Sequence, residues 1–111
     1  MLIYKIFRAP EWAKLQSRGE TLGAPVDLAD GFVHFSTADQ VQETAARHFA
    51  GEGDLCLLAL EADALGEALK WEPSRGGDLF PHLYRPLRLV DVLWQKPLPL
   101  KQGAHDFTGL L

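Results

Sequence analysis

Two short segments of the sequence carry side chains suited to proton transfer and polar contacts. The first, residues 31–40, contains His34 followed by two hydroxyl side chains. The second, residues 80–86, places a histidine, a tyrosine and an arginine between two prolines: His82, Tyr84 and Arg85. An imidazole changes its charge close to neutral pH, so it can donate, accept or carry a proton there. The two histidines are therefore the first candidates for catalytic residues.

Residues 32–37 predict a strand that leads into a helix. The aromatic and β-branched side chains of residues 32–35 favour a strand. Thr37 and Gln40 have the spacing of a capping box, which makes Thr37 the expected N-cap. In an extended strand, His34 and Ser36 share one face. A helix start offers free N–H groups and a partial positive charge, so this junction could bind an anionic or polar small molecule.

The second segment presents its side chains on rigid backbone. In extended chain, His82 and Tyr84 point the same way, whereas Arg85 points to the other side unless the flanking prolines turn the chain. Glu72 could act as a general base or accept a hydrogen bond from a sugar hydroxyl. Arg75 precedes two glycines, whose backbone N–H groups can approach a ligand closely.

Each candidate also has a purely structural interpretation. A histidine among apolar neighbours is often a core residue with satisfied hydrogen bonds, and Ser36 and Thr37 could simply begin the helix. Tyr84 and Arg85 could cover the core at a sheet edge. The four basic side chains between residues 70 and 88 could be solvated surface charges, or they could form a pocket for a phosphate or carboxylate.

Other kinds of catalytic site have little support in the sequence. Cys56 is the only cysteine and lies in an apolar run, so we expect a buried thiol and no disulfide. The histidines lack the short paired spacings of a metal motif, and we expect no metal. Ser36 does not lie in the turn that serine hydrolases use, and the glycines after Arg75 do not match a nucleotide fingerprint.

Size and composition indicate one globular domain over residues 1–111. The hydrophobic fraction is 47% and the charged fraction is 23%, as in ordinary globular proteins. A net charge of −4 with scattered basic residues argues against nucleic-acid binding, and no apolar segment approaches the length of a membrane span. The first residues lack the apolar stretch of a signal peptide, so we expect a cytoplasmic protein. The sequence leaves the oligomeric state open.

Periodicity and turn residues predict an α+β fold with a curved, mixed or split sheet and two main helices. We expect one helix between Pro10 and Gly19, a second over residues 38–50 and a helical turn over residues 62–68. The expected strands cover residues 2–7, 32–35, 54–61 and 87–94, with the third of these buried at the centre of a sheet. The expected loops cover residues 21–30 and 71–80, and a loosely held tail begins at residue 101.

Several segments together resemble a known family over nearly the whole chain. They are residues 5–12, 27–40, 48–51, 71–73 and 77–87, in that order. They look like a small bacterial family catalogued as domain of unknown function 952. The resemblance implies a fold similar to that of the ADP-ribosyltransferases, in which a curved, split sheet holds NAD.

The resemblance also implies roles for single residues. His34 would anchor the ribose of NAD, and the hydroxyls of Ser36 and Thr37 would support its nicotinamide side. A side chain within residues 82–85 would contact a phosphate or the acceptor. The acidic motif with which these transferases activate an acceptor is missing, which leaves Glu72 as the remaining candidate.

Two functional hypotheses follow. The first is a transferase-like enzyme that acts on NAD, ADP-ribose or another nucleotide, and the second is a non-catalytic module that binds a small ligand or a partner. An acidic side chain beside the paired histidines would favour the enzyme, whereas a closed, apolar pocket with both histidines hydrogen-bonded only to backbone would favour the module. The enzyme hypothesis assigns catalysis to His34, His82 and Glu72, and ligand binding to Ser36, Thr37, Tyr84, Arg85 and Arg75.

Overall fold

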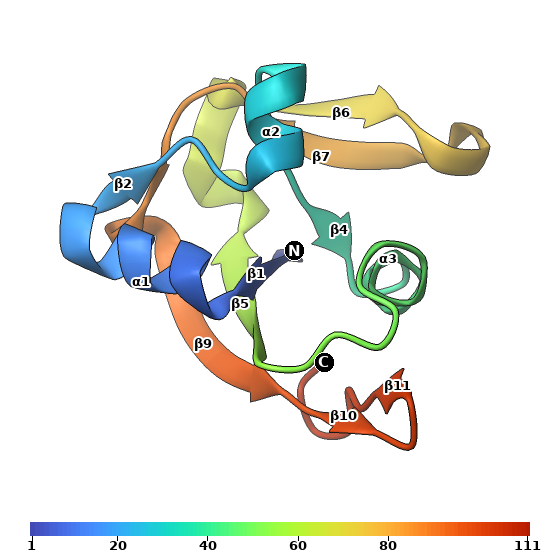
Figure 1. Cartoon of the computed structure of the whole chain (residues 1–111). Coiled ribbons are helices and arrows are strands. Elements are labelled where there is room, and N and C mark those ends of the chain that lie inside the picture. Colours follow the sequence, from blue (N-terminus) through green and yellow to red (C-terminus); the bar gives the residue numbers. More distant parts are fainter.

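A four-stranded antiparallel sheet forms the centre of the fold (Figure 1). The computed structural model describes the whole chain apart from the side chain of Arg75. Strands β1 (Leu2–Arg8) and β5 (Leu55–Glu61) pair along their whole length at the middle of this sheet. The edges are β4 (Ser36–Thr37) beside β1 and β9 (Val92–Leu98) beside β5. The prediction of a buried central strand over residues 54–61 is confirmed.

A second sheet brings the two histidine segments together. Its order is β3 (Val33–His34), β7 (Leu79–Leu83) and β6 (Leu69–Pro73). The chain leaves this sheet at Phe35, whose N–H donates to the carbonyl of Pro81 at 3.0 Å, and enters the central sheet at β4. The strand expected over residues 32–35 is confirmed for residues 33–34, but the prediction missed the change of sheet at Phe35 and the second strand, β4, that follows it.

Two small sheets and the helices complete the α+β domain. Strand β2 (Glu20–Thr21) pairs with β8 (Leu87–Arg88), and β10 (Leu100–Lys101) pairs with β11 (Ala104–His105). The strands are divided among separate sheets, so the sheet is split, as expected. All the strand pairs of the described residues are antiparallel, so the sheet is not mixed. The helices are α1 (Ala9–Arg18), α2 (Pro25–Asp30) and α3 (Val41–His48), with short 3₁₀ turns η1 (Ala62–Ala68), η2 (Arg75–Gly77) and η3 (Leu89–Asp91). None of the described helices is long and apolar enough to cross a membrane.

Helix α2 lies where we expected a loop. Pro25 at its first position and Gly31 after its end, with φ 85°, are the usual boundary residues of a helix. Helix α3 also begins later than predicted. The N–H of Thr37 donates to Oε1 of Gln40 at 3.0 Å and closes a turn before the helix, so Thr37 is not its N-cap.

Three further predictions of secondary structure differ from the structure. Residues 71–80 belong largely to the hairpin of β6 and β7, which pair from Leu69–Leu83 to Pro73–Leu79. The strand expected over residues 87–94 is interrupted by η3, where Oδ2 of Asp91 accepts the N–H of Arg88 at 2.9 Å. The final segment forms β10 and β11 rather than a loose tail.

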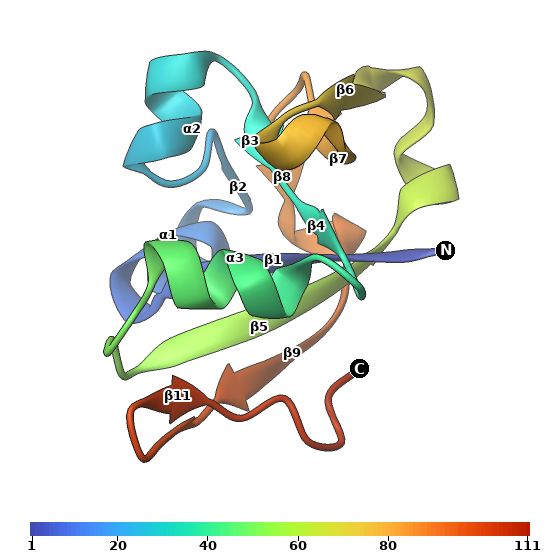
Figure 2. The ribbon, with the colours of Figure 1, turned by 90° about the vertical axis from the view of Figure 1, so that its right-hand side faces the viewer.

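The central sheet is buried on both faces. On one face a first core packs against α1 and the second sheet; its members include Ile3, Phe7, Leu15, Leu58 and Leu83. On the other face a second core packs against α3 and the C-terminal segment (Figure 2); its members include Tyr4, Val41, Ala45, Leu57 and Phe107. The two cores hold the sheets and helices in one compact domain.

Candidate functional site

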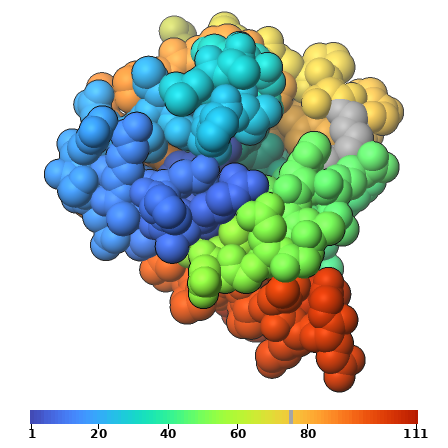
Figure 3. Space-filling view, viewed as in Figure 1, coloured from blue at the N-terminus to red at the C-terminus, as the bar shows by residue number. Residues whose placement is uncertain are grey.

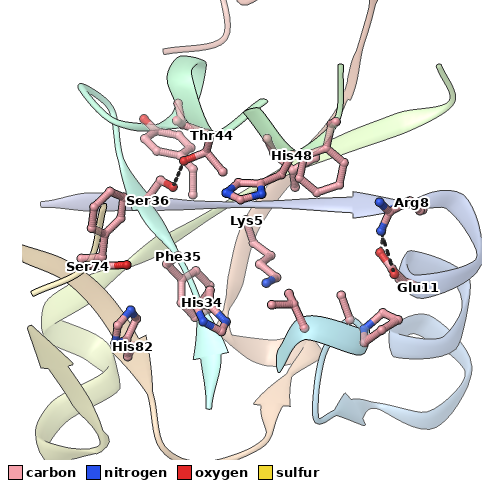
Figure 4. A pocket seen from close by; sticks show the side chains of 18 residues that line it. Lys5, Arg8, Glu11, His34, Phe35, Ser36, Thr44, His48, Ser74 and His82 are labelled. Atoms are coloured by element: carbon pink, nitrogen blue, oxygen red, sulfur yellow. Dashed lines mark hydrogen bonds and ion pairs between the residues drawn. The ribbon is translucent and has the colours of Figure 1, made fainter. Parts of the chain in front are cut away.

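A cavity of about 630 Å³ lies where α2, α3 and both sheets approach one another. Figure 3 shows the hollow between α2, the beginning of the chain and α3. This volume suits a small organic ligand, because binding pockets commonly measure about 300–1,000 Å³. Figure 4 shows the polar side chains around it, and they come from distant parts of the chain: Lys5, Arg8, Glu11, His34, Ser36, Thr44, His48, Ser74 and His82.

The two histidines lie next to each other in the cavity wall. His34 of β3 and His82 of β7 are direct partners in the antiparallel register. Their ring centroids are 5.2 Å apart and the rings are inclined at 68°. Side chains that are far apart in the sequence therefore converge on one place. This convergence is the condition that a shared catalytic role requires.

His34 contacts a carboxylate at each ring nitrogen. Its Nδ1 lies 2.7 Å from Oδ1 of Asp27, and its Nε2 lies 3.0 Å from Oδ2 of Asp30. Its backbone N–H also donates to Oδ1 of Asp27 at 3.0 Å. Both acidic residues belong to α2, so this short helix fixes the orientation of the ring.

Asp27 also binds Lys5 in the interior of the protein. The ammonium of Lys5 lies 2.8 Å from Oδ2 and 3.0 Å from Oδ1 of Asp27, and Oδ2 accepts the N–H of Ala24 at 2.7 Å. Burial raises the pKa of Asp27. The hydrogen bonds from His34 and the charge of Lys5 together lower this pKa by more than burial raises it, so the pKa of Asp27 lies below its ordinary value. Burial lowers the pKa of Lys5, against the opposing effect of Asp27.

His82 has a carboxylate on one nitrogen only. Its Nδ1 lies 2.9 Å from Oε1 of Glu72, which also accepts the hydroxyl of Tyr84 at 2.6 Å. These two hydrogen bonds, from Tyr84 and then His82, hold the pKa of Glu72 below its ordinary value, and Glu72 in turn raises the pKa of Tyr84. Glu72 and Tyr84 do not line the cavity, so they reach it only through His82.

Phe32 packs against this group of rings. Its ring stacks on His82 with centroids 4.2 Å apart and an angle of 28°. Its centroid is also 4.5 Å from that of His34 and 5.1 Å from that of Tyr84. Contacts with three neighbouring rings restrict the rotation of both imidazoles.

Several predicted ligand-binding residues are used elsewhere. Ser36 lines the cavity, but its hydroxyl bonds that of Thr44 at 2.9 Å. Thr37 does not line the cavity. Arg85 also lies outside it and forms a two-point ion pair with Asp91 at 2.9 and 3.1 Å. The side chain of Arg75 lies outside the described part of the structure.

The sequence analysis missed Lys5, Asp27 and Asp30 as residues of this site. The pattern of a proline followed by a glycine at helical distance, Pro25 and Gly31, would have indicated the helix that carries both acidic residues. Nothing in the local sequence distinguishes Lys5 from a lysine at the surface, because its burial depends on contacts across the cavity.

The other candidate chemistries are absent from the described residues. Among them, no group of three or more histidine, cysteine or acidic side chains could hold a metal ion. Cys56 is buried, as predicted, and burial raises the pKa of its thiol to about 11. A thiol in that state is a poor nucleophile.

Comparison with known proteins identifies a family whose model covers both histidine segments. The family, described as "Protein of unknown function (DUF952)", matches residues 6–95. The X-ray crystal structure of protein CC0527 from Caulobacter crescentus is similar at 50% identity and a TM-score of 0.94, over 97% of this chain and 96% of that chain. Its solution NMR structure gives a TM-score of 0.88 at 50% identity, over 99% and 96%. No curated protein matches the sequence.

Proposed function

The chain belongs to the family described as a protein of unknown function (DUF952), and we propose that its cavity is the active site of an enzyme acting on a small nucleotide-like ligand. NAD and ADP-ribose are the ligands to test first. The observation that carries this proposal is the pair of adjacent imidazoles, each with Nδ1 against a carboxylate. Enzymes use such carboxylate–histidine pairs to fix the tautomer of a catalytic ring and to stabilise its charged form.

The charges around the cavity support an anionic ligand. Lys5, Arg8, His34 and His48 contribute basic groups to its wall. Among the described lining residues, Glu11 is the one carboxylate, and it lies 3.5 Å from Arg8. A phosphate group would therefore meet mainly positive or neutral side chains, which favours its binding.

The apolar part of the wall supports the rest of a nucleotide. The side chains of Tyr4, Val41, Phe49 and Phe80 line the cavity and offer surfaces on which a flat base can pack. A cavity that combines apolar walls with a few polar groups is typical of small-molecule sites.

The proposal includes a relationship to the ADP-ribosyltransferases. A cavity between two antiparallel sheets suits the position in which a split sheet would hold NAD. Because Glu72 does not line the cavity, its proposed contribution is to support His82 and not to contact an acceptor directly. Fold analogy alone does not assign a reaction, so the chemistry rests on the histidine pair.

The second candidate is a non-catalytic module that binds a ligand in the same cavity. Such a module needs no oriented proton carrier, and its histidines would be satisfied by backbone partners. The carboxylates at His34 and His82 favour the enzyme.

A thermal-shift titration tests ligand binding. NAD, ADP-ribose, AMP and pyrophosphate are added separately, and a ligand of the native state at about 100 times its Kd stabilises the fold by about 2.7 kcal/mol. We expect a rise of several degrees in Tm for at least one nucleotide, and loss of that rise in His34→Gln. His105→Gln is the matched control, because His105 bonds the carbonyl of Glu52 and does not line the cavity. An unchanged Tm across the panel would contradict the proposal.

Product analysis then separates the two candidates. The stabilising ligand is incubated with the protein and followed by chromatography and mass spectrometry. Conversion by the natural chain but not by His82→Asn supports the enzyme. Binding without any conversion would support the module instead.

A further inference from the structure

We propose that the two histidines have different, fixed roles: His82 accepts a proton from the ligand through Nε2, and His34, whose ring nitrogens both face carboxylates, shapes the cavity wall beside it. This inference rests on the proposed function of the cavity, since it divides the work of the same site. It also makes a claim about the free protein, which can be tested without any ligand.

Both ring nitrogens of His34 face carboxylate oxygens. Nδ1 lies 2.7 Å from Oδ1 of Asp27, in a hydrogen bond, and Nε2 lies 3.0 Å from Oδ2 of Asp30, in a close polar contact. Neither nitrogen of His34 is therefore open to accept a proton from a ligand.

The contacts of His82 leave one nitrogen available. Its Nδ1 faces Glu72, an acceptor, and so carries the hydrogen of a neutral ring. Its Nε2 has no hydrogen-bond partner among the described residues. Since no fully buried polar side-chain atom among the described residues lacks a partner, Nε2 must reach the accessible surface, and His82 lines the cavity. The lone pair of Nε2 is thus open to a ligand.

Glu72 is the residue that fixes this arrangement. Its Oε1 accepts hydrogen bonds from both Tyr84 and His82, so the carboxylate acts purely as an acceptor. After His82 has taken a proton at Nε2, the same carboxylate stabilises the resulting imidazolium. Glu72 is therefore a positioning residue, because it acts only through His82.

The open nitrogen of His82 defines what the ligand must offer. An O–H group lies beside Nε2 of His82, with the ring of His34 next to it at a centroid distance of 5.2 Å. The O–H belongs to the ligand or to a water bound next to it. The proton passes to Nε2 of His82, and the electron pair of the broken O–H bond remains on the oxygen as a nucleophile.

Electrostatics favours the same division. Two imidazolium rings at this separation would repel each other, and Phe32 stacks on His82 and helps to keep water from its face. The charges that face His34 are Asp27 and Asp30 of α2, with Lys5 of β1 behind Asp27. Those near His82 are Glu72 and Lys70 of β6, with Lys70 opposite His82 in the strand register, and His34 itself.

Nitrogen NMR of the free protein tests the assignment directly. Long-range ¹H–¹⁵N spectra of ¹⁵N-histidine-labelled protein at pH 7 distinguish an imidazolium from each neutral tautomer. We expect a hydrogen on Nδ1 alone of His82. A hydrogen on Nε2 of His82 in the free protein would overturn the proposal.

Two matched variants separate positioning from general stability. In Glu72→Gln we expect His82 to lose its single tautomer, with a mixed shift pattern for its nitrogens, while the signals of His34 stay unchanged. In Asp30→Asn we expect the reverse, with altered nitrogen signals for His34 only. A folded Glu72→Gln variant with an unaltered His82 pattern would contradict the role of Glu72.

Chemical labelling gives an independent measurement. Diethyl pyrocarbonate attacks the unprotonated nitrogen of imidazole, so we expect His82 to react through Nε2 before His34 does, as followed by peptide mass spectrometry. Faster labelling of His34 would overturn the proposal. Neither measurement uses a ligand, so a failed nucleotide titration together with the expected labelling would reject the proposed ligand class and leave the division of roles intact.

Discussion

Asp27 connects three parts of the site through one carboxyl group. It is 1% exposed and accepts hydrogen bonds from Lys5, from the ring and backbone of His34, and from the N–H of Ala24. Lys5 is itself buried, and its ammonium has Asp27 as its charged partner. Removing one member of a buried ion pair leaves an uncompensated charge, which costs more than the pair contributes.

We predict that Asp27→Asn lowers the free energy of unfolding at pH 7 by about 3–5 kcal/mol. The folded-state pKa of Asp27 lies below its ordinary value, so the unfolded chain takes up the proton first as the pH falls. The stability that Asp27 contributes is therefore present above about pH 4 and is lost as the pH falls through the folded pKa. Urea unfolding at pH 7 and pH 3 measures both effects, and the difference between the two proteins shrinks in acid.

Asp30→Asn is the matched control for this prediction. Asp30 lies on the same helix but is 48% exposed and contacts only His34 among the described residues. Surface substitutions usually change stability by about 0.5 kcal/mol or less, and we expect that range here. If both variants lost the same free energy of unfolding, the buried pair of Asp27 and Lys5 would contribute no more to stability than the exposed Asp30 does.

Residue type alone identified the histidines, but not their partners. His34 and His82 are conspicuous in sequence because few other side chains act near neutral pH. Their partners Asp27 and Glu72 are ordinary acidic residues until α2 and β6 bring them within 2.9 Å of the rings. Arg85 illustrates the opposite case, since its bonds to Asp91 turn a candidate ligand-binding residue into part of an internal ion pair.

Helix α2 is the element on which the site depends most. It supplies both carboxylates of His34, yet Asp27 is its one buried residue, and Val26 and Leu28 are more than half exposed. The turn before it contains Gly23 with φ 104°, a conformation that other residues adopt only with strain. A Cβ at Gly23 would lie 2.7 Å from the Cβ of Asp27, so only glycine fits there.

Gly31 lies at the end of the same helix. We predict that Gly23→Ala destabilises the fold more than Gly31→Ala does. Both positions have positive φ, which costs a side chain about 1–2 kcal/mol. At Gly31 an added Cβ meets nothing within 4 Å, whereas at Gly23 it displaces Asp27. Thermal unfolding measures the order of the two variants. A larger loss in Gly31→Ala would contradict this account of the turn.

Elements were predictable where local signals define them. Helix α1 ends at Gly19 with φ 78°, and β5 is the apolar run that the sequence showed. The break between β3 and β4 is set by a distant partner, the carbonyl of Pro81, and a pattern along the chain cannot contain such a contact. The turn η3 is held locally, because Asp91 accepts hydrogen bonds from the N–H of Arg88 and the side chain of Arg85, and this local signal was missed.

At the scale of the whole molecule, the cavity and the second core meet, because Tyr4, Ile6 and Val41 belong to both. The C-terminal segment follows the family-matched residues 6–95 and contributes Phe107, 9% exposed, to the second core. This segment was expected to be loosely held because most of its residues are polar, and the sequence alone did not indicate that the ring of Phe107 anchors it. The α+β class and the single domain follow from composition and periodicity, but the division into several antiparallel sheets does not.

We predict that Phe107→Ala lowers the free energy of unfolding by about 3 kcal/mol, as for other buried phenylalanines. The histidine NMR signals should be unchanged in the folded variant, because Phe107 packs with Val41, Ala45 and Leu98 and not with His34 or His82. Leu111→Ala, at a residue 47% exposed, is the control and should have little effect. Altered histidine spectra in Phe107→Ala would show that the C-terminal segment helps to shape the site.

The carboxylate shared by Lys5 and His34 has a consequence for how the site responds to substitution. The two basic residues belong to different sheets, and both bind Asp27. Their energetic effects should therefore be non-additive: a double-mutant cycle between β1 and β3 would give a coupling energy, transmitted through a third residue, of about 0.5–3 kcal/mol. Evolution or engineering at either position would then be constrained by the other, a form of epistasis that a list of pairwise contacts would overlook.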